Sequence, residues 1–514
     1  MEVALPSSAN EPVIHRLVDD ILAYILLLNA TIPEHAATVA SSQVCTRWRS
    51  IALNYHTIWG HIIDYHRHPL KWIEILLDRS NPSLLDFGSR INRVYCAIIA
   101  DDGQGVLELV FNHIDRLRIF NAEIPVSSWE LVCSRFLQLP APNLEFVHAF
   151  VYDGVAGPLT HPLFDNRAPN LQSLGLPWGT VDFTSPILTP LTELYVRDIA
   201  NGSPTVLEWL YILGGMPSLR WVTLIHAISS APANDICPVI HLSALVMLSI
   251  DGPFHESVTL VDHLIVPPRC GLRLRCDGAH LGFHQRRLWA NIEKKMDSWA
   301  RNSPNRHLEA SSTYSHWNDG SNVTIGNTRL PGPSGAPWST EAAEVANGLC
   351  AGGSGVDPVM TIVLRLAENQ NAVPLFLSLF ALFEWTFFDT THLKLWIDYY
   401  PNDGAEVFLP LVDSFRGLVN LEKLSLGYDI PTDFPFPLLQ QANSVILPAL
   451  KSIEFIDAEF HSGSESLNPV VDFLRWRREQ GFPVQKIEIF QVSCYVDREY
   501  ILAHIQDTLV EINE

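Results

Sequence analysis

Pro169-Asn170-Leu171-Gln172-Ser173-Leu174-Gly175-Leu176 is the stretch that decides the fold, and Pro190-Leu191-Thr192-Glu193-Leu194-Tyr195-Val196 repeats its pattern 20 residues later. Both stretches follow the template Leu-x-x-Leu-x-Leu, in which another apolar residue can replace leucine. Alternate side chains of a strand point to the same face, so the last two apolar residues of the template define a strand with one buried face. Such a strand has no core of its own and must stack on neighbouring strands.

The same template recurs along the chain. It occurs at Ile114-Leu117-Ile119, Leu144-Val147-Ala149, Leu219-Val222-Leu224, Leu245-Leu248-Ile250, Leu421-Leu424-Leu426, Leu450-Ile453-Phe455 and Val484-Ile487-Ile489. The first six templates start 20 to 30 residues apart, which is similar to the spacing of leucine-rich repeats. Several units also open with proline, as in Pro142-Asn143-Leu144 and Pro217-Ser218-Leu219. The sequence therefore predicts an α/β solenoid that resembles leucine-rich repeats.

Helical stretches between the templates predict a mostly parallel sheet, because each strand returns through a helix or a long turn. The expected helices include Trp129–Leu137, Thr205–Leu213 after a Ser203-Pro204 cap, and Pro469–Gln480 before Gly481. The asparagine or cysteine that usually follows the strand in regular repeats is missing, so we expect an irregular solenoid. The template leucines that we expect to be buried are Leu174, Leu194, Leu224, Leu248 and Leu424.

Short helices are predicted before the repeats. An amphipathic stripe at helical spacing is formed by Leu17, Ile21, Ile25 and Leu28. Thr31-Ile32-Pro33-Glu34 has the form of a capping box, in which the threonine and glutamate side chains satisfy first-turn amides of a second helix. A further helix carries Val44, Trp48 and Ile51 on roughly one side.

This N-terminal segment resembles the F-box family. The similarity lies in Ile14-His15-Arg16-Leu17-Val18-Asp19-Asp20-Ile21-Leu22, in Val44-Cys45-Thr46-Arg47-Trp48-Arg49-Ser50-Ile51-Ala52 and in Ile58-Trp59. The family pattern is roughly Leu-Pro-x-Glu-Ile-Leu, then Val-Cys-x-x-Trp-Arg, then Leu-Trp. This chain has Val18 where the family usually has proline, and Asp20 where glutamate is commoner. Residues 72–86 resemble the helix-turn-strand that follows the F-box in a group abundant in mushroom-forming fungi.

The resemblance implies a substrate-recognition subunit of a cullin–RING (SCF-type) ubiquitin ligase. Such a protein binds the Skp-type adaptor through its F-box and recruits a protein substrate with the rest of the chain. Contact between helices needs apolar side chains at helical spacing. The implied adaptor-binding residues are Leu17, Val18, Ile21, Leu22, Ile25, Val44, Cys45, Trp48, Ile51 and Trp59. The alternative is a scaffold or receptor without a ligase role, in which these residues form the core of a small helical domain.

Three segments are predicted on this basis. Residues 12–60 form an F-box helical domain, 61–100 a connecting helix-turn-strand, and 101–514 the leucine-rich-repeat-like solenoid. Residues 302–358 contain Pro, Gly, Ser and Asn throughout, which predicts a flexible loop or insertion.

Side chains between the template leucines should point away from the core, onto the open face of the sheet. In this register Tyr195, Trp221 and Lys423 lie on that face. Aromatic groups and a charge of this kind are enriched at protein interfaces, so these residues are candidates for substrate binding. The alternative is that Tyr195 and Trp221 pack under a covering loop, such as the 302–358 insertion.

Composition argues against several other functions. The net charge of −22 opposes binding to nucleic acid or to an anionic membrane surface. The longest apolar runs, Ile21–Leu28 and Val373–Phe383, are too short to span a membrane. The eight cysteines have no framework spacing. Together with the absence of a signal peptide, these features predict a protein of the cytoplasm, the nucleus or both.

Enzyme chemistry is not expected, because the sequence has no nucleophile elbow, phosphate-binding loop or dinucleotide fingerprint. The one metal-like cluster contains Cys270, Cys276, His280 and His284, but its Cys-x5-Cys spacing does not suit zinc. We therefore expect no cofactor and no bound metal.

Overall fold

The computed structural model contains two compact units, Met1–Val196 and Arg197–Glu514. The structure describes residues 17–30, 35–88, 96–97, 103–151, 162–177, 182–197, 203–229, 237–267, 270–277, 307–315, 320–327, 360–365, 391–397, 412–413, 415–427, 436–440, 445–456, 468–490 and 508–513. The predicted capping box at residues 31–34 lies outside these residues. No helix in these ranges is both long enough and apolar enough to cross a membrane.

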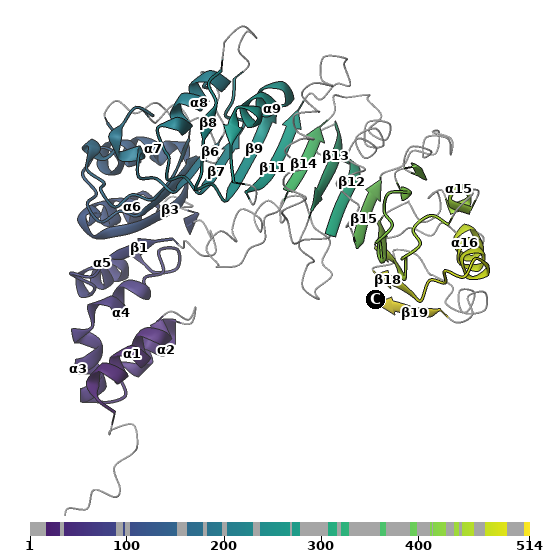
Figure 1. Cartoon of the computed structure of the whole chain (residues 1–514). Coiled ribbons are helices and arrows are strands. Elements are labelled where there is room, and N and C mark those ends of the chain that lie inside the picture. Colours follow the sequence, from purple (N-terminus) through teal and green to yellow (C-terminus); the bar gives the residue numbers. More distant parts are fainter. Residues whose placement is uncertain are drawn as a thin grey trace, which may run out of the picture. The chain divides into compact units, whose positions relative to one another are not determined.

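The first unit begins with short helices (Figure 1). They are α1 (Asp19–Ala30), α2 (His35–Ser41), α3 (Thr46–Asn54), α4 (His56–His61) and α5 (Leu70–Arg79). Helix α1 packs against α2, α3 and α4. The amides of Ile21 and Leu22 donate to the Val18 carbonyl at the start of α1. Two aspartates lie in this first turn, where their negative charge is stabilised by the positive end of the helix dipole. The buried Trp59 indole donates to the Ala52 carbonyl at 2.7 Å and joins α4 to α3.

A buried arginine fixes the turn from α5 into β1 (Leu85–Phe87). The Arg116 guanidinium donates to the Ser83 carbonyl at 2.8 Å, to the Leu77 carbonyl at 3.2 Å and to the Ser80 hydroxyl at 2.8 Å. Burial lowers the pKa of Arg116, but these acceptors satisfy its donors. A helix, a turn and a strand therefore occupy residues 70–87, within the segment predicted to have this order.

The sheet of the first unit is parallel. Its further strands are β2 (Cys96–Ala97), β3 (Leu117–Ile124), β4 (Phe146–Val151), β5 (Ser173–Pro177) and β6 (Glu193–Arg197). Strand β3 pairs with β1, β2 and β4, and β4 pairs with β5. Helical segments precede or join these strands, namely α6 (Gly103–Phe111), η3 (Ile114–Arg116), α7 (Val126–Val132), η4 (Cys133–Leu137), η5 (Leu163–Asn166) and η6 (Pro186–Leu188). The predicted helix 129–137 corresponds to α7 with the π-helical turn η4, and it begins earlier because Pro125 is its N-cap.

The second unit also contains a mostly parallel sheet. Its elements are α8 (Val206–Gly214), β7 (Trp221–Ile225), β8 (Ile240–His241), β9 (Met247–Pro253), α9 (Phe254–Asp262), β10 (Leu264–Ile265), β11 (Gly271–Asp277), β12 (His307–Ser315), β13 (Gly320–Asn327), β14 (Met360–Arg365), β15 (His392–Ile397), β16 (Lys423–Gly427), α15 (Phe436–Gln440), β17 (Ser452–Ile456), α16 (Asn468–Glu479), β18 (Lys486–Phe490) and β19 (Leu509–Asn513). Strands pair in the order β7-β9-β11-β14-β13-β12-β15-β16-β17-β18-β19. Only β13 runs antiparallel to its neighbours among these pairs.

Two strands of this sheet correct a prediction. The segment 302–358 was expected to be a loop, yet β12 and β13 lie within it and form an antiparallel pair. Strand propensity explains the difference, since Val323, Thr324 and Ile325 are β-branched and favour strands despite the surrounding glycine, serine and asparagine. The rest of that segment lies outside the described residues.

The template leucines belong to the core of both units. All five that were expected to be buried are at most 2% exposed, which confirms the prediction. The first leucine of seven templates closes a tight turn, with its amide donating three residues back at 3.1 to 3.2 Å; these residues are Leu144, Leu171, Leu191, Leu219, Leu245, Leu421 and Leu450. Asn143 and Asn170 donate side-chain amides to the carbonyls of Asp115 and Pro142, each 28 residues earlier.

Two local predictions need correction. In the first template Phe120, not Ile119, aligns with the core residue Val147 of the next strand, because the pairing of β1 and β3 is irregular after Leu117. Helix α8 is capped by Thr205, not by the two residues before it: the hydroxyl accepts from the Glu208 amide at 3.3 Å, and the Glu208 carboxylate accepts from the Thr205 amide at 2.8 Å.

Candidate protein-binding surfaces

Helix α1 exposes apolar side chains along one side. Val18, which precedes the helix, is 63% exposed and Tyr24 is 59% exposed. At 100° per residue these two lie on the same side as Ile21, Ile25 and Leu28. Leu22, Ala23, Leu26 and Ala30 occupy the other side and are buried. The helix is therefore apolar on both sides, and one of them faces solvent.

The start of α3 is tied to the start of α1. The Arg47 guanidinium donates to the Leu17 carbonyl and pairs with the Asp19 carboxylate at 2.6 Å. The Tyr55 hydroxyl donates to Asp20 at 3.0 Å, and this hydrogen bond raises the Tyr55 pKa. Val44, three residues before Arg47, is 64% exposed. We call six side chains the α1 face: the exposed Val18, Ile21, Tyr24, Leu28 and Val44, and the half-buried Ile25.

The residues implied as adaptor-binding divide into two groups. Exposed or half-buried positions are held by Leu17, Val18, Ile21, Ile25, Val44, Cys45 and Trp48. Leu22, Ile51 and Trp59 are at most 5% exposed, so they belong to the interior that supports the face and not to the face itself. Tyr24 was missed in the sequence, although helical spacing places it beside Ile21 and Leu28.

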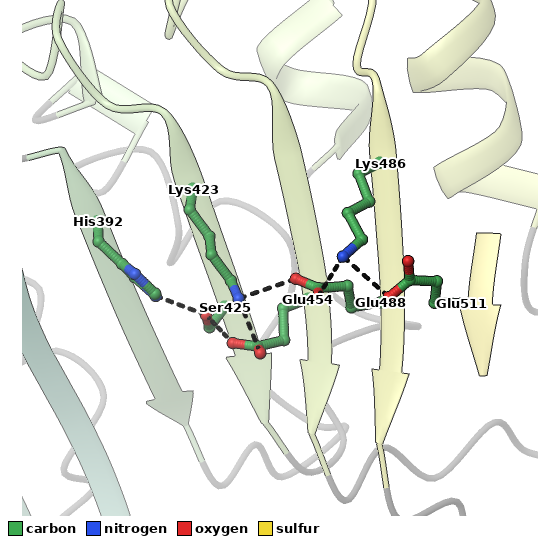
Figure 2. Close-up of polar contacts among 7 residues, drawn as sticks. All are labelled: His392, Lys423, Ser425, Glu454, Lys486, Glu488 and Glu511. Atoms are coloured by element: carbon green, nitrogen blue, oxygen red, sulfur yellow. Dashed lines mark hydrogen bonds and ion pairs between the residues drawn. The ribbon is translucent and has the colours of Figure 1, made fainter. Parts of the chain in front are cut away.

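A second surface crosses the C-terminal strands of the second unit (Figure 2). Strands β16 to β19 pair in register, so that Lys423, Ser452, Lys486 and Leu509 form one row. Ser425, Glu454, Glu488 and Glu511 form the next row on the same face. These residues alternate with buried ones such as Leu424 and Ile487, so this face lies opposite the core.

Two lysines separate the carboxylates of that row. The Lys423 ammonium lies 2.9 Å from both Glu454 and Glu488, and the Lys486 ammonium lies 2.8 Å from Glu488 and 2.9 Å from Glu511. We call these five residues the charge ladder. Burial favours the neutral form of Glu488, but hydrogen bonds from Lys486 and Lys423 outweigh it and lower the Glu488 pKa. Burial likewise opposes the charge of Lys423, yet its two carboxylates raise the Lys423 pKa overall.

A histidine, a serine and a glutamate form a hydrogen-bonded relay beside the ladder. The Ser425 hydroxyl donates to Glu454, and His392 Nε2 lies 2.9 Å from the Ser425 oxygen. A hydroxyl has one proton, so Ser425 accepts from His392. The histidine is then a donor to the serine and not its general base, which excludes activation of Ser425 as a nucleophile in this arrangement.

The same relay occurs in the first unit among aromatic rings. His148 Nε2 lies 3.0 Å from the Ser173 hydroxyl, which donates to Glu193 at 2.9 Å. The rings of His148 and Phe150 contact Tyr195, with centroids 5.9 and 4.9 Å apart. The residues of this relay are buried, as are His392 and Ser425 of the other one.

The three predicted substrate-binding residues lie on the sheet face opposite the core, because they alternate with buried residues along their strands. Each is half-buried. Tyr195 packs in the aromatic cluster of the first unit, and the ring of Trp221 lies 4.5 Å from the Arg220 guanidinium. Lys423 is held by its two carboxylates. The structure thus gives each of the three a neighbour within the chain.

The described ranges contain no group of three or more His, Cys, Asp and Glu side chains that could hold a metal ion. His280 and His284 of the candidate cluster lie outside these ranges. Burial raises the pKa of Cys133 and of Cys270 to about 12, so both thiols are protonated at neutral pH and are poor nucleophiles.

Comparison with known proteins adds no relative. No protein-family model matches the sequence, and no curated protein matches it.

Proposed function

We propose that this protein is the substrate-recognition subunit of a cullin–RING ubiquitin ligase. In this proposal the N-terminal helices are an F-box, and the α1 face binds the Skp-type adaptor. The single observation that carries the proposal is the exposure of the apolar side of α1 in a protein with a net charge of −22. Apolar side chains gathered on one exposed surface are typical of a binding site.

The form of the face supports a helical partner. Val18, Ile21, Ile25 and Leu28 follow helical spacing, and an apolar stripe of this kind packs against helices of another protein. Burial of apolar surface is worth roughly 25 cal/mol per Å². Trp48 on α3 is half-buried, and large aromatic anchors carry much of the energy of such interfaces.

The departure from the family pattern at Val18 is compatible with this role. Val18 precedes the first residue of α1, and its carbonyl accepts the first amides of the helix. Proline is tolerated at such a position because its missing amide is not needed. Valine keeps an apolar group there, and its side chain is among the most exposed apolar ones of the described residues.

The remaining strands form the scaffold in this proposal, as an irregular solenoid that resembles leucine-rich repeats. The recurring turn before each template leucine and the parallel pairing support it. The second candidate function is a scaffold without a ligase role. It is favoured by Leu22, Ile51 and Trp59, whose burial is what a small helical capping domain needs.

Co-purification of the Skp-type adaptor with Trp48→Ala separates these functions. We expect the full chain to retain the adaptor and the variant to lose it, because a central aromatic anchor is worth roughly 2–4 kcal/mol. A folded Trp48→Ala protein that retains the adaptor undiminished contradicts the F-box assignment. Failure of the unaltered chain to bind the adaptor favours the scaffold.

A further inference from the structure

The charge ladder is incomplete at one end. Glu488 is held by two lysines, and Glu454 is held by Lys423 and by the Ser425 hydroxyl. Glu511 pairs with Lys486 alone among the contacts of the described residues, and it is 43% exposed. Three carboxylates share two ammonium groups, so the last carboxylate has room for a further cation.

Among the described strands of the second unit, β19 is the last one at this end of the ladder. Strand β19 pairs with β18 over five residues, and no other strand in the described ranges of this unit pairs with it (Figure 1). The Leu509 amide donates towards β18, to the Gln485 carbonyl at 2.9 Å. Because backbone groups alternate in direction along a strand, the amides of Val510 and Ile512 point to the opposite edge. An extended segment can pair with such an edge.

The side chains of β19 specify the chemistry of that segment. Leu509 takes the place that Lys486 holds on the neighbouring strand β18, and it is 57% exposed. A new strand would therefore meet an apolar side chain and, two residues on, a half-paired carboxylate. A glutamate or aspartate placed there would extend a row of like charges, which destabilises strand pairing.

We propose that the edge of β19 binds an extended basic segment of a partner protein. The segment adds as a further strand and places a lysine or arginine against Glu511 and an apolar side chain against Leu509. This inference deepens the proposed function by naming the substrate class, and it rests on that function only for the identity of the partner as a substrate. The strongly acidic chain favours the encounter with such a segment.

Binding of short synthetic peptides to the full chain, followed by fluorescence anisotropy at low salt, tests the proposal. The probe alternates lysine with threonine and valine, and the control peptide carries glutamate in place of lysine. We expect binding of the lysine peptide only, and about tenfold weaker binding by Glu511→Gln, because one charge-assisted contact is lost. Glu422→Gln is the matched control, since Glu422 is a comparably exposed carboxylate paired with Lys451 away from β19.

Two further arms keep the result decisive. Glu511→Lys should prefer the glutamate peptide, which shows that a weakened variant is still folded. A lysine peptide methylated on the backbone amides that would pair with β19 should lose binding, because strand addition needs those amides. Equal binding of both peptides, unchanged binding by Glu511→Gln, or full binding of the methylated peptide overturns the proposal. Adaptor binding is measured on the same proteins, so failure of the proposed function is seen separately.

Discussion

The α1 face and the charge ladder each lie on an element whose opposite side is buried. They differ in the kind of side chain that they present to water. The α1 face leaves apolar side chains exposed. The ladder alternates lysines and glutamates that satisfy one another. The first surface therefore needs a partner to remove apolar area from water. In the second, each carboxylate has an ammonium partner, and Glu511 shares its partner Lys486 with Glu488. We infer that the two surfaces bind by different physics.

The difference has an energetic consequence. Docking onto the middle of the ladder would strip water from paired charges, and that cost can exceed the gain from their attraction. Docking onto the α1 face carries no such cost for its apolar side chains. The adaptor should therefore bind with weak salt dependence, and a basic segment at β19 with strong salt dependence.

The largest expected effect concerns the buried layer beneath the ladder. Leu424→Ala should destabilise the second unit by about 2–5 kcal/mol, because it leaves a cavity under β16. Leu28→Ala removes the same atoms from an exposed position of the α1 face and should cost much less. Urea unfolding followed by tryptophan fluorescence measures both. A Leu28→Ala loss as large as that of Leu424→Ala would mean that α1 has no exposed side.

A smaller loss of stability is expected when one lysine of the charge ladder is removed. Lys423→Met should destabilise the second unit by about 1–2 kcal/mol, because it leaves Glu454 and Glu488 partly buried with one partner fewer. Lys451→Met breaks an exposed pair with Glu422 and should cost less than about 1 kcal/mol. Urea midpoints of the two variants give the comparison. Equal midpoints would show that the ladder is no stronger than an ordinary surface pair.

The pH dependence of stability should be the smallest effect. The Glu488 pKa is lowered in the folded protein, so its contribution is present above the unfolded value of about 4.3 and is lost as pH falls through the folded pKa. The Lys423 pKa is raised, so its contribution is present below about 10.4 and is lost as pH rises through the folded pKa. Glu488→Gln should flatten the acid side of a stability–pH curve, and a curve identical to that of the unaltered chain would contradict the pairing.

The buried leucines could be predicted from the sequence because side chains alternate between the two faces of a strand, so apolar residues two positions apart in each template mark the buried face. The apolar stripe of α1 could be predicted for the same kind of reason. The sequence did not show that Leu22 is buried and Ile21 exposed. A helix that is apolar on both sides does not reveal which side its neighbours cover.

The ladder was missed for a different reason. Glu454, Glu488 and Glu511 lie about one repeat apart and look like ordinary surface residues in the sequence. They become neighbours only through the register of β17, β18 and β19. The available signal was the recurring pattern of Ser452-Ile453-Glu454 and Lys486-Ile487-Glu488, in which an apolar residue separates two polar ones. Lys423 was noticed alone, without its partners.

The most direct test is the affinity of the full chain for the purified Skp-type adaptor, measured by calorimetry. Ile21→Glu places a charge in the centre of the α1 face and should weaken binding by about 100-fold or more, since a buried unpaired charge is costly. Val126→Glu introduces the same charge at an exposed apolar position at the start of α7, and it should bind like the unaltered chain. Equal affinity of a folded Ile21→Glu protein, or no binding by the unaltered chain, would contradict the account.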